Sequence, residues 1–247
     1  MTDLWVRQIS GDTEQPHYRW FVSQSGEQGS GELSVMAARW PEATLTLLIS
    51  GADCPSRRIK FKSQEKRHLA RLVPYELESD LAQDVAGLHV ALGSPIQGGS
   101  SENQPNAGTT AESDVDEPAL VASYIDKREL ADRIRVLEAI GFDVRHCYAE
   151  PLLLPASVDS WVLRLTDGQV DVAWGTGAAA SVDLSMLGIL LDAMLHSPAA
   201  ASVTPPRELQ LQAVTQPELD VLAAQVNASA LVQSWQPEVA SALLSGA

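Results

Sequence analysis

The sequence predicts an α/β protein in which one arrangement of strands and a helix occurs twice. Near the N-terminus the apolar pattern indicates three meandering strands, a helix and a buried strand. The C-terminal part again shows a strand meander followed by a helix and a strand. A piece of different character, residues 54–140, separates the two. The 247 residues suffice for one large domain, or for two to three small ones with a core each.

The first part alternates short apolar runs with turn residues. Trp5 and Trp20 lie in two such runs, which a polar turn separates. The run TLTLLIS at 44–50 is almost entirely apolar, as is typical of a strand buried on both faces. We expect strands at 4–9, 18–23, 29–33 and 44–50, and a short helix at 35–40.

The inserted piece begins with a strand that has one polar face. In residues 58–62, RIKFK, basic and apolar side chains alternate with the period of a β-strand. Two helices split at Pro74 and a strand at 88–92 are expected next. Residues 93–118 have almost no large apolar side chains, so they cannot offset the entropy of ordering, and we expect a disordered surface loop.

A capped helix closes the inserted piece. Asp126 can cap a helix over 127–139, and Gly141 can end it. Strands are expected before and after it, at 120–125 and 142–148.

The C-terminal part opens with a hairpin. Asp167-Gly168 is a two-residue turn signal between apolar runs at 161–165 and 169–174. The elements expected after it are a strand at 179–183, a helix at 184–196, a linker at 198–206, a strand at 208–214 and a helix at 217–226 with Thr215 as its cap.

Charge is distributed unevenly along the inserted piece. Seven of the chain's seventeen Lys and Arg lie between residues 57 and 71, and none lies between 72 and 126. Pro74 can start a helix, because it has no amide hydrogen to leave unpaired. On that helix one face would hold Leu77, Leu81 and Val85, and a neighbouring stripe would hold Glu76, Asp80 and Asp84, with Glu78 adding to the charge.

Like charges four residues apart on a helix cost a few tenths of a kcal/mol per pair. The acidic stripe therefore suggests a basic partner. A solvated face in an acidic protein is the alternative interpretation.

Composition excludes several classes of protein. A net charge of −15 argues against nucleic acid as a partner, and the basic cluster has no interleaved aromatic side chains on which bases could stack. Cys54 and Cys147 lie too far apart for a CxxC motif and are expected to be two reduced, partly buried thiols. The longest apolar stretch, 184–195, is shorter than the roughly 20 residues of a membrane helix, and the N-terminus has no secretory signal.

No set of residues predicts catalysis. The five histidines lack metal-binding spacing, and Cys147 and the adjacent His146 should point to opposite faces of a strand. Gly175-Thr176-Gly177 lacks the third glycine of a dinucleotide fingerprint and the lysine of a P-loop, which favours a plain turn. We expect no catalytic residue, no metal site and no cofactor.

Several motifs of the chain resemble the cytoplasmic region of protein L of the bacterial type II secretion system, the GspL family. The resemblance is carried by LVPYELE at 72–78, LAQDV at 81–85, LHV at 88–90, GFDVR at 141–145 running into Pro151 and Leu152, and LLSG at 243–246. It implies an actin-like ATPase fold, similar to the cell-division actin homologue and to pilus protein M. Residues 1–53 and 141–157 would form the first RNase H-like half, 54–140 the inserted subdomain and 158–247 the second half.

The resemblance also implies a function. Such a protein would be a platform component on the cytoplasmic side of the bacterial inner membrane, and it would recruit the secretion ATPase, protein E, by binding its N-terminal region. A transmembrane helix and a periplasmic domain would follow this chain, and protein M, other platform proteins and a second copy would be further partners. We expect the docking surface to consist of Tyr75, Glu76, Leu77, Glu78, Asp80, Leu81 and Asp84.

Two other hypotheses belong to different classes. The first is an actin-like ATPase or sugar kinase that uses the cleft between the halves. Residues 7–12, RQISGD, and 166–169, TDGQ, would occupy its phosphate-binding turns, and they match the Asp and Gly pattern of such turns poorly. This favours a scaffold without hydrolysis. The second is a homodimerising structural module.

Overall fold

The computed structural model describes most of the chain. The described residues are 2–9, 16–78, 81, 84–96, 118–157, 159–175, 177–196 and 206–244. Most of the loop predicted at 93–118 and of the linker predicted at 198–206 lies outside them.

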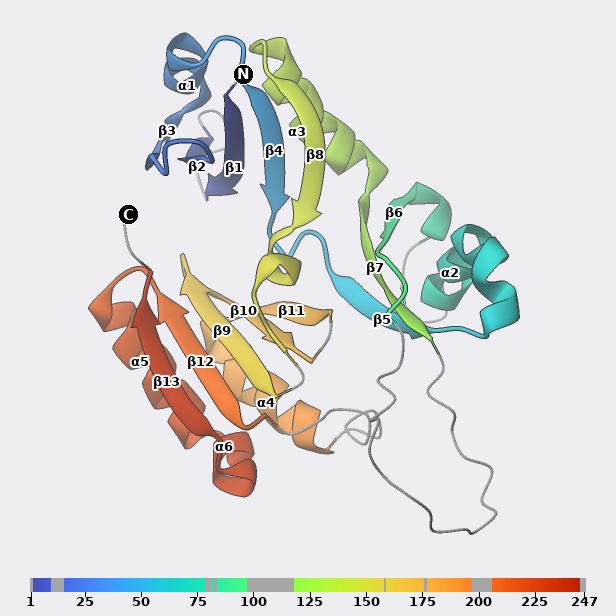
Figure 1. The fold of residues 1–247 in the computed structure, drawn as a ribbon, viewed down its shortest axis with the longest axis vertical. Coiled ribbons are helices and arrows are strands. Elements are labelled where there is room, and N and C mark those ends of the chain that lie inside the picture. The colour runs from blue at the N-terminus through green and yellow to red at the C-terminus, as the bar shows by residue number, and fades with distance from the viewer. Residues whose placement is uncertain are drawn as a thin grey trace.

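The first of three sheets contains the N-terminal meander (Figure 1). In spatial order its strands are β3 (Gln28–Glu32), β2 (His17–Val22), β1 (Asp3–Ile9), β4 (Thr44–Ile49) and β8 (Asp143–Ala149). The meander is antiparallel, and β1, β4 and β8 run parallel. Helices α1 (Leu33–Arg39) and α3 (Lys127–Ala139) contribute Met36 and Leu137 to its core. β4 is buried on both faces, as its unbroken apolar run predicts.

The second five-stranded sheet repeats the same order with later elements. Its strands are β11 (Ala178–Asp183), β10 (Gln169–Trp174), β9 (Ser160–Thr166), β12 (Glu208–Ala213) and β13 (Glu238–Leu243). Helices α4 (Leu187–His196), α5 (Gln216–Ala228) and α6 (Ala230–Trp235) lie against one face (Figure 1). The repeat of meander, helix and parallel strand predicted from the sequence is therefore present. α6 and β13 were not predicted.

Local chemistry explains several element boundaries. Asp126 accepts hydrogen bonds from the amides of Arg128 and Glu129, as its predicted capping role requires. Thr215 and Glu218 form a capping box at the start of α5. Asp167 and Gly168 both have positive φ, 53° and 78°, which a two-residue hairpin turn between right-twisted strands demands.

The third sheet is small and lies beside the other two (Figure 1). Its order is β5 (Ser56–Lys60), β7 (Ala119–Asp126) and β6 (Leu88–Leu92), all antiparallel. Two short 3₁₀ turns, η1 (Ser63–His68) and η2 (Val85–Gly87), flank helix α2 (Leu69–Glu78). α2 covers one face of the sheet, and Val73 and Leu77 pack there against Ile59, Phe61 and Leu120.

The boundaries of the inserted piece remain a prediction. Leu137 of α3 is fully buried in the core of the first sheet, and Leu130 packs against that core. We therefore propose that the inserted piece ends near Asp126, where β7 stops, instead of at residue 140 as the sequence suggested. Among the described residues, no helix is long and apolar enough to cross a membrane.

Candidate functional site

The helix predicted to start at Pro74 begins five residues earlier. α2 starts at Leu69 and contains Pro74, so the prediction of two helices split at that proline is wrong. Leu69, Val73 and Leu77 recur every fourth residue and are all buried in one core. Burial of this apolar face outweighs the preference of proline for a first turn.

The acidic stripe is also shorter than predicted. α2 ends at Glu78 and Asp84 lies at the start of η2, so Glu76 and Asp84 do not share one helix face. Asp84 instead caps η2, where its carboxylate accepts a 2.8 Å hydrogen bond from the amide of Ala86. Asp80 lies outside the described residues.

The predicted docking residues divide by burial. Tyr75 is 72% exposed, and Glu76, Glu78 and Asp84 are exposed as well. Leu77 is 1% exposed and belongs to the core beneath α2, and Leu81 is half-buried against that core. The sequence had left open whether the apolar residues pack inside or anchor a contact. The structure answers this for Leu77, which packs inside, and for Tyr75, which faces outward.

A groove of about 540 Å³ runs between α2 and the segment from η2 into β6. Pro74, Tyr75 and Val85 form part of its apolar wall. Its charged side chains are Arg71, Glu78, Asp84 and Lys127. The acidic residues there are thus accompanied by cations from α2 itself and from α3, which the sequence could not reveal because Lys127 is distant along the chain. We call this feature the α2 groove.

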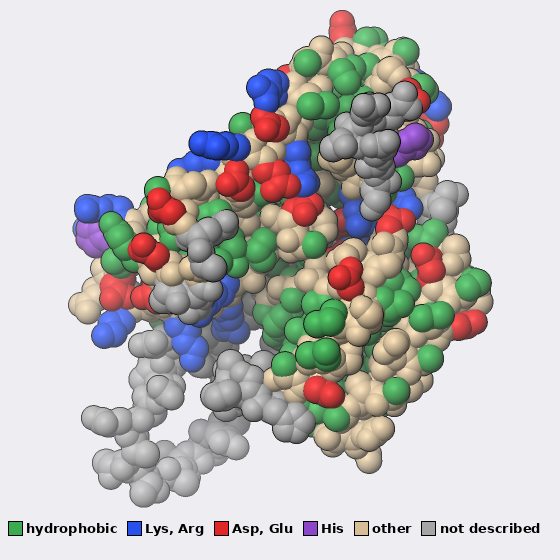
Figure 2. Space-filling model, turned by 180° about the vertical axis from the view of Figure 1, so that it is seen from behind, with side chains coloured by type: hydrophobic (Ala, Val, Ile, Leu, Met, Phe, Trp, Pro, Cys, Tyr) green, Lys and Arg blue, Asp and Glu red, His purple; other side chains and the backbone are tan. Residues whose placement is uncertain are grey.

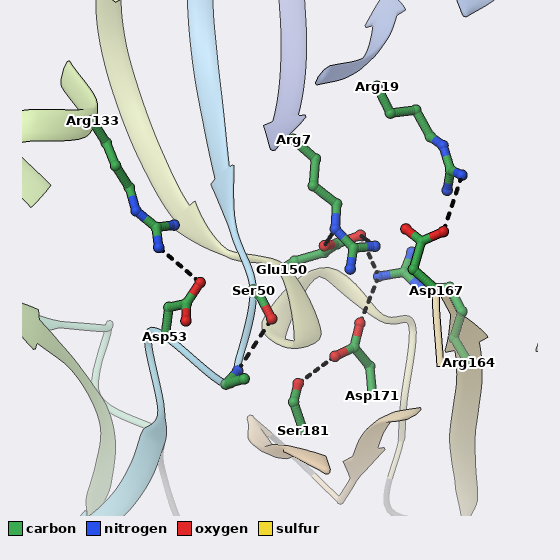
Figure 3. Close-up of polar contacts among 11 residues, drawn as sticks. Arg7, Arg19, Ser50, Asp53, Arg133, Glu150, Arg164, Asp167, Asp171 and Ser181 are labelled. Carbon is green, nitrogen blue, oxygen red and sulfur yellow. Dashed lines mark hydrogen bonds and ion pairs between the residues drawn. The ribbon is translucent and has the colours of Figure 1, made fainter. Parts of the chain in front are cut away.

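The second candidate site is the cleft between the two large sheets (Figure 3). Its centre is Glu150, in a 3₁₀ turn that follows β8 (η3, Glu150–Leu153). Arg7, from β1 of the first sheet, places Nε 3.0 Å from Oε2 of Glu150 and Nη1 3.4 Å from Oε1. Arg164, from β9 of the second sheet, donates from Nη2 to the same Oε1 at 3.0 Å. One buried carboxylate therefore joins an arginine of each sheet.

One further ion pair is joined to Glu150 through Arg164, and two separate pairs lie nearby. Arg164 also lies 3.3 Å from Asp171, whose other oxygen accepts a hydrogen bond from Ser181. Arg19 faces Asp167 at 3.7 Å, and Arg133 of α3 contacts Asp53 at 2.8 Å. The ion-pair network of the cleft thus consists of Arg7, Arg19, Arg133, Arg164, Asp53, Glu150, Asp167 and Asp171.

Burial changes the acidity of several groups. It raises the pKa of Glu150, and the positive charges of Arg7 and Arg164 oppose that rise. Burial also raises the pKa of the Cys54 thiol to about 11 and raises that of Cys147. Both cysteines are free thiols, and thiols with raised pKa values are poor nucleophiles at neutral pH.

The described arginines of the cleft are paired with carboxylates. Phosphate sites present unengaged backbone amides or cations, whereas the arginines here contact carboxylates from both sides of the cleft. The hairpin turn at 166–169 holds Asp167 against Arg19. Two cavities of about 180 and 270 Å³ flank the network, below the range of about 300 to 1,000 Å³ usual for cofactor sites. Residues 10–12 of the other predicted turn lie outside the described residues.

Sequence reasoning did not single out Glu150, Arg164 or Asp171. A signal for two of them was present, because Arg164 and Asp171 are charged residues inside the apolar runs WVLRL and VDVAW. A charge in a buried strand requires a partner, and that requirement could have drawn attention to the cleft.

Comparisons with known proteins find similarity to one family. A family model described as "Type II secretion system (T2SS), protein L" matches residues 4–100. The "Type II secretion system protein L" of Pectobacterium carotovorum subsp. carotovorum is 26% identical over 198 residues, which cover 76% of this chain and 42% of the relative.

This chain is similar to protein L of type II secretion systems. It spans less than half the length of the Pectobacterium family member.

Solved structures confirm the predicted fold class. The cytoplasmic domain of EpsL, "an inner membrane component of the type II secretion system of Vibrio cholerae", aligns with a TM-score of 0.62 at 19% identity and covers 94% of this chain and 98% of that one. The "PilM-PilN type IV pilus biogenesis complex" aligns with a TM-score of 0.60 at 11% identity, covering 98% and 88%. The two large mixed sheets with flanking helices thus form an actin-like fold, as the resemblance implied.

Proposed function

We propose that this chain is a docking module of the type II secretion inner-membrane platform and acts on the cytoplasmic side of the membrane. It recruits the secretion ATPase, protein E, by binding the N-terminal region of that enzyme. Its contacts with protein M, with other platform proteins and with a second copy are part of the same proposal. Similarity to protein L of type II secretion systems supports this role, and the similar fold of a chain in the "PilM-PilN type IV pilus biogenesis complex" supports assembly with a protein partner.

The observation that carries the proposal against an enzyme is the ion-pair network. In an actin-like ATPase the cleft between the halves must hold a triphosphate and a metal ion. Here the centre of the cleft is occupied by Glu150, held between Arg7 and Arg164. A triphosphate would have to displace buried, mutually paired charges, each of which costs several kcal/mol to leave unpaired.

The α2 groove is the proposed ATPase-docking surface. Tyr75 projects from it and supplies an aromatic anchor of the kind that dominates protein interfaces. Glu78 and Asp84 share its wall with Arg71 and Lys127, so these charges would pair with side chains of the docked segment and fix its orientation. Leu77 is removed from the predicted contact set, because it lies in the core.

The test is binding of the N-terminal region of protein E to variants of this chain. Tyr75→Ala and the pair Glu78→Lys, Asp84→Lys should weaken binding at least about tenfold, which corresponds to about 1.4 kcal/mol. A matched control is Asp132→Lys with Asp143→Lys, which makes the same charge change on exposed parts of α3 and β8. Unchanged binding by the groove variants would move the docking surface elsewhere.

Calorimetry with ATP and magnesium tests the rival enzyme. We expect no heat of binding. A micromolar affinity would support a nucleotide-dependent function. It would contradict the proposal that the paired charges of Arg7, Glu150 and Arg164 leave no site for a triphosphate.

A further inference from the structure

A second surface of the inserted piece is strongly basic. Strand β5 and turn η1 carry Arg57, Arg58, Lys60, Lys62, Lys66 and Arg67, and all six side chains are exposed. We call this set the β5 surface. In Figure 2 the inserted piece lies on the left, and blue side chains are seen along its left and lower edges. The surface is unusual, because the whole chain carries 32 acidic residues against 17 basic ones.

The fold accounts for the exposure of these cations. Ile59 and Phe61 turn inward to the core beneath α2, so the alternating cations between and beside them stay in solvent. The acid within this segment, Glu65, is engaged locally, because its carboxylate accepts a 2.8 Å hydrogen bond from the amide of Lys62. It helps to order the turn, and its single negative charge leaves the segment with an excess of positive charge.

The shape of the β5 surface indicates a broad anionic partner instead of a small ligand. None of the six cations lines the α2 groove or the two cavities of the cleft. Its side chains are long and flexible, and they extend along a strand and the following turn. Such an extended set of cations can contact many negative charges at once when the partner is a flat, negatively charged surface.

The surface lacks the features that nucleic acids and proteins use. Phe61 is 5% exposed, so its ring is not available for base stacking. The centres of protein interfaces are rich in exposed aromatic and apolar anchors, and here Ile59 and Phe61 are both buried. Clusters of four to eight Lys and Arg that lie close to a membrane bind anionic lipid headgroups, and the β5 surface has six such cations.

We propose that the β5 surface contacts the anionic phospholipid headgroups of the membrane. This contact rests on the membrane location in the proposed function, but it does not depend on ATPase docking. The overall charge of −15 does not forbid it. At physiological salt the Debye length is about 8 Å, so acids on distant faces are screened while the six cations act at contact range. The lipid contact would fix one face of the chain toward the bilayer.

The experiment is sedimentation of the whole 247-residue chain with phosphatidylethanolamine vesicles, with and without added phosphatidylglycerol and cardiolipin. The chain should bind only the anionic vesicles and should be released by high salt. The variant Arg58→Glu, Lys60→Glu leaves the core residue Ile59 in place. Each lost cation weakens binding roughly fivefold, so this variant should bind at least about 25-fold more weakly.

The matched control makes the same charge change elsewhere. Arg135→Glu with Arg145→Glu alters exposed arginines of α3 and β8 and should weaken vesicle binding less than about threefold. Thermal unfolding of both variants should match the parent chain, since exposed substitutions rarely exceed about 0.5 kcal/mol.

Three outcomes would overturn the proposal: no binding to anionic vesicles, equal binding to neutral vesicles, or equal loss in both variants. Binding of polyglutamate through Arg58 and Lys60 without vesicle binding would assign the surface to an acidic protein instead. Binding of protein E is measured in parallel with the same variants. Loss of vesicle binding with unchanged binding of protein E concerns the lipid contact alone, whereas loss of protein E binding concerns the proposed function.

Discussion

The ion pair between Arg7 and Glu150 gives the sharpest test of how much the buried charges of the cleft contribute to stability. Arg7→Met keeps the apolar stem of the side chain and removes its charge. The two side chains are 11% and 9% exposed, and removing one partner of a buried pair typically costs about 3 to 5 kcal/mol. Because Arg164 keeps its 3.0 Å contact with Glu150, we expect a loss of about 3 kcal/mol in the free energy of unfolding near neutral pH.

The loss should depend on pH in a defined direction. Burial raises the pKa of Glu150 in the folded protein, and removing Arg7 removes a charge that opposes this rise, so the pKa should rise further. A carboxyl with a raised folded pKa contributes stability that is fully present below its unfolded pKa and is lost as pH rises through the folded pKa. Arg7→Met should therefore cost less at about pH 5, where more of Glu150 is protonated, than at about pH 8.

Urea unfolding at the two pH values measures this difference. Arg19→Met is the matched control, since its pair with Asp167 spans 3.7 Å and both side chains are 37% exposed, and it should cost less than about 1 kcal/mol. The reasoning is refuted if Arg7→Met costs no more than the control, or if its cost is the same at both pH values.

Three further predictions concern the fold. Thr215→Ala removes the capping box of α5 and should cost about 1 kcal/mol in urea unfolding, whereas an unchanged midpoint would mean that the box adds nothing. Gly51→Ala brings a Cβ against Ser181 and Pro151 and should cost about 1 to 3 kcal/mol, while Gly87→Ala, whose Cβ meets open space, should be nearly neutral; equal effects would contradict the close approach of chain segments at Gly51. Cys54 should react slowly with iodoacetamide at about pH 8 and quickly in urea, because burial raises its pKa to about 11, and rapid labelling of the native chain would show that the site is open.

Much of the fold was predictable because its signals are local. The Asp167-Gly168 turn, the Asp126 cap and the apolar run of β4 each fix an element through neighbouring residues. The repeat of meander, helix and strand then followed from the order of these elements. Proline at position 74 misled the prediction, because the buried face of α2 is a tertiary feature that overrides a local preference.

The sites were less predictable for the same reason. Glu150 meets Arg7 across 143 positions of sequence, and Lys127 enters the α2 groove from the far side of an insertion. The acidic character of residues 76–84 was visible in the sequence. Its interpretation as one uncompensated helix face required a helix that continues past Glu78, where α2 ends. Only the folded structure shows that Arg71 and Lys127 lie beside Glu78 and Asp84.

The central claim is that this chain acts by binding another protein. Isothermal titration of the 247-residue chain with the N-terminal region of the secretion ATPase from the same system tests it most directly. We predict saturable one-to-one binding with a dissociation constant of about micromolar or tighter. The absence of binding at concentrations well above that value would contradict the account.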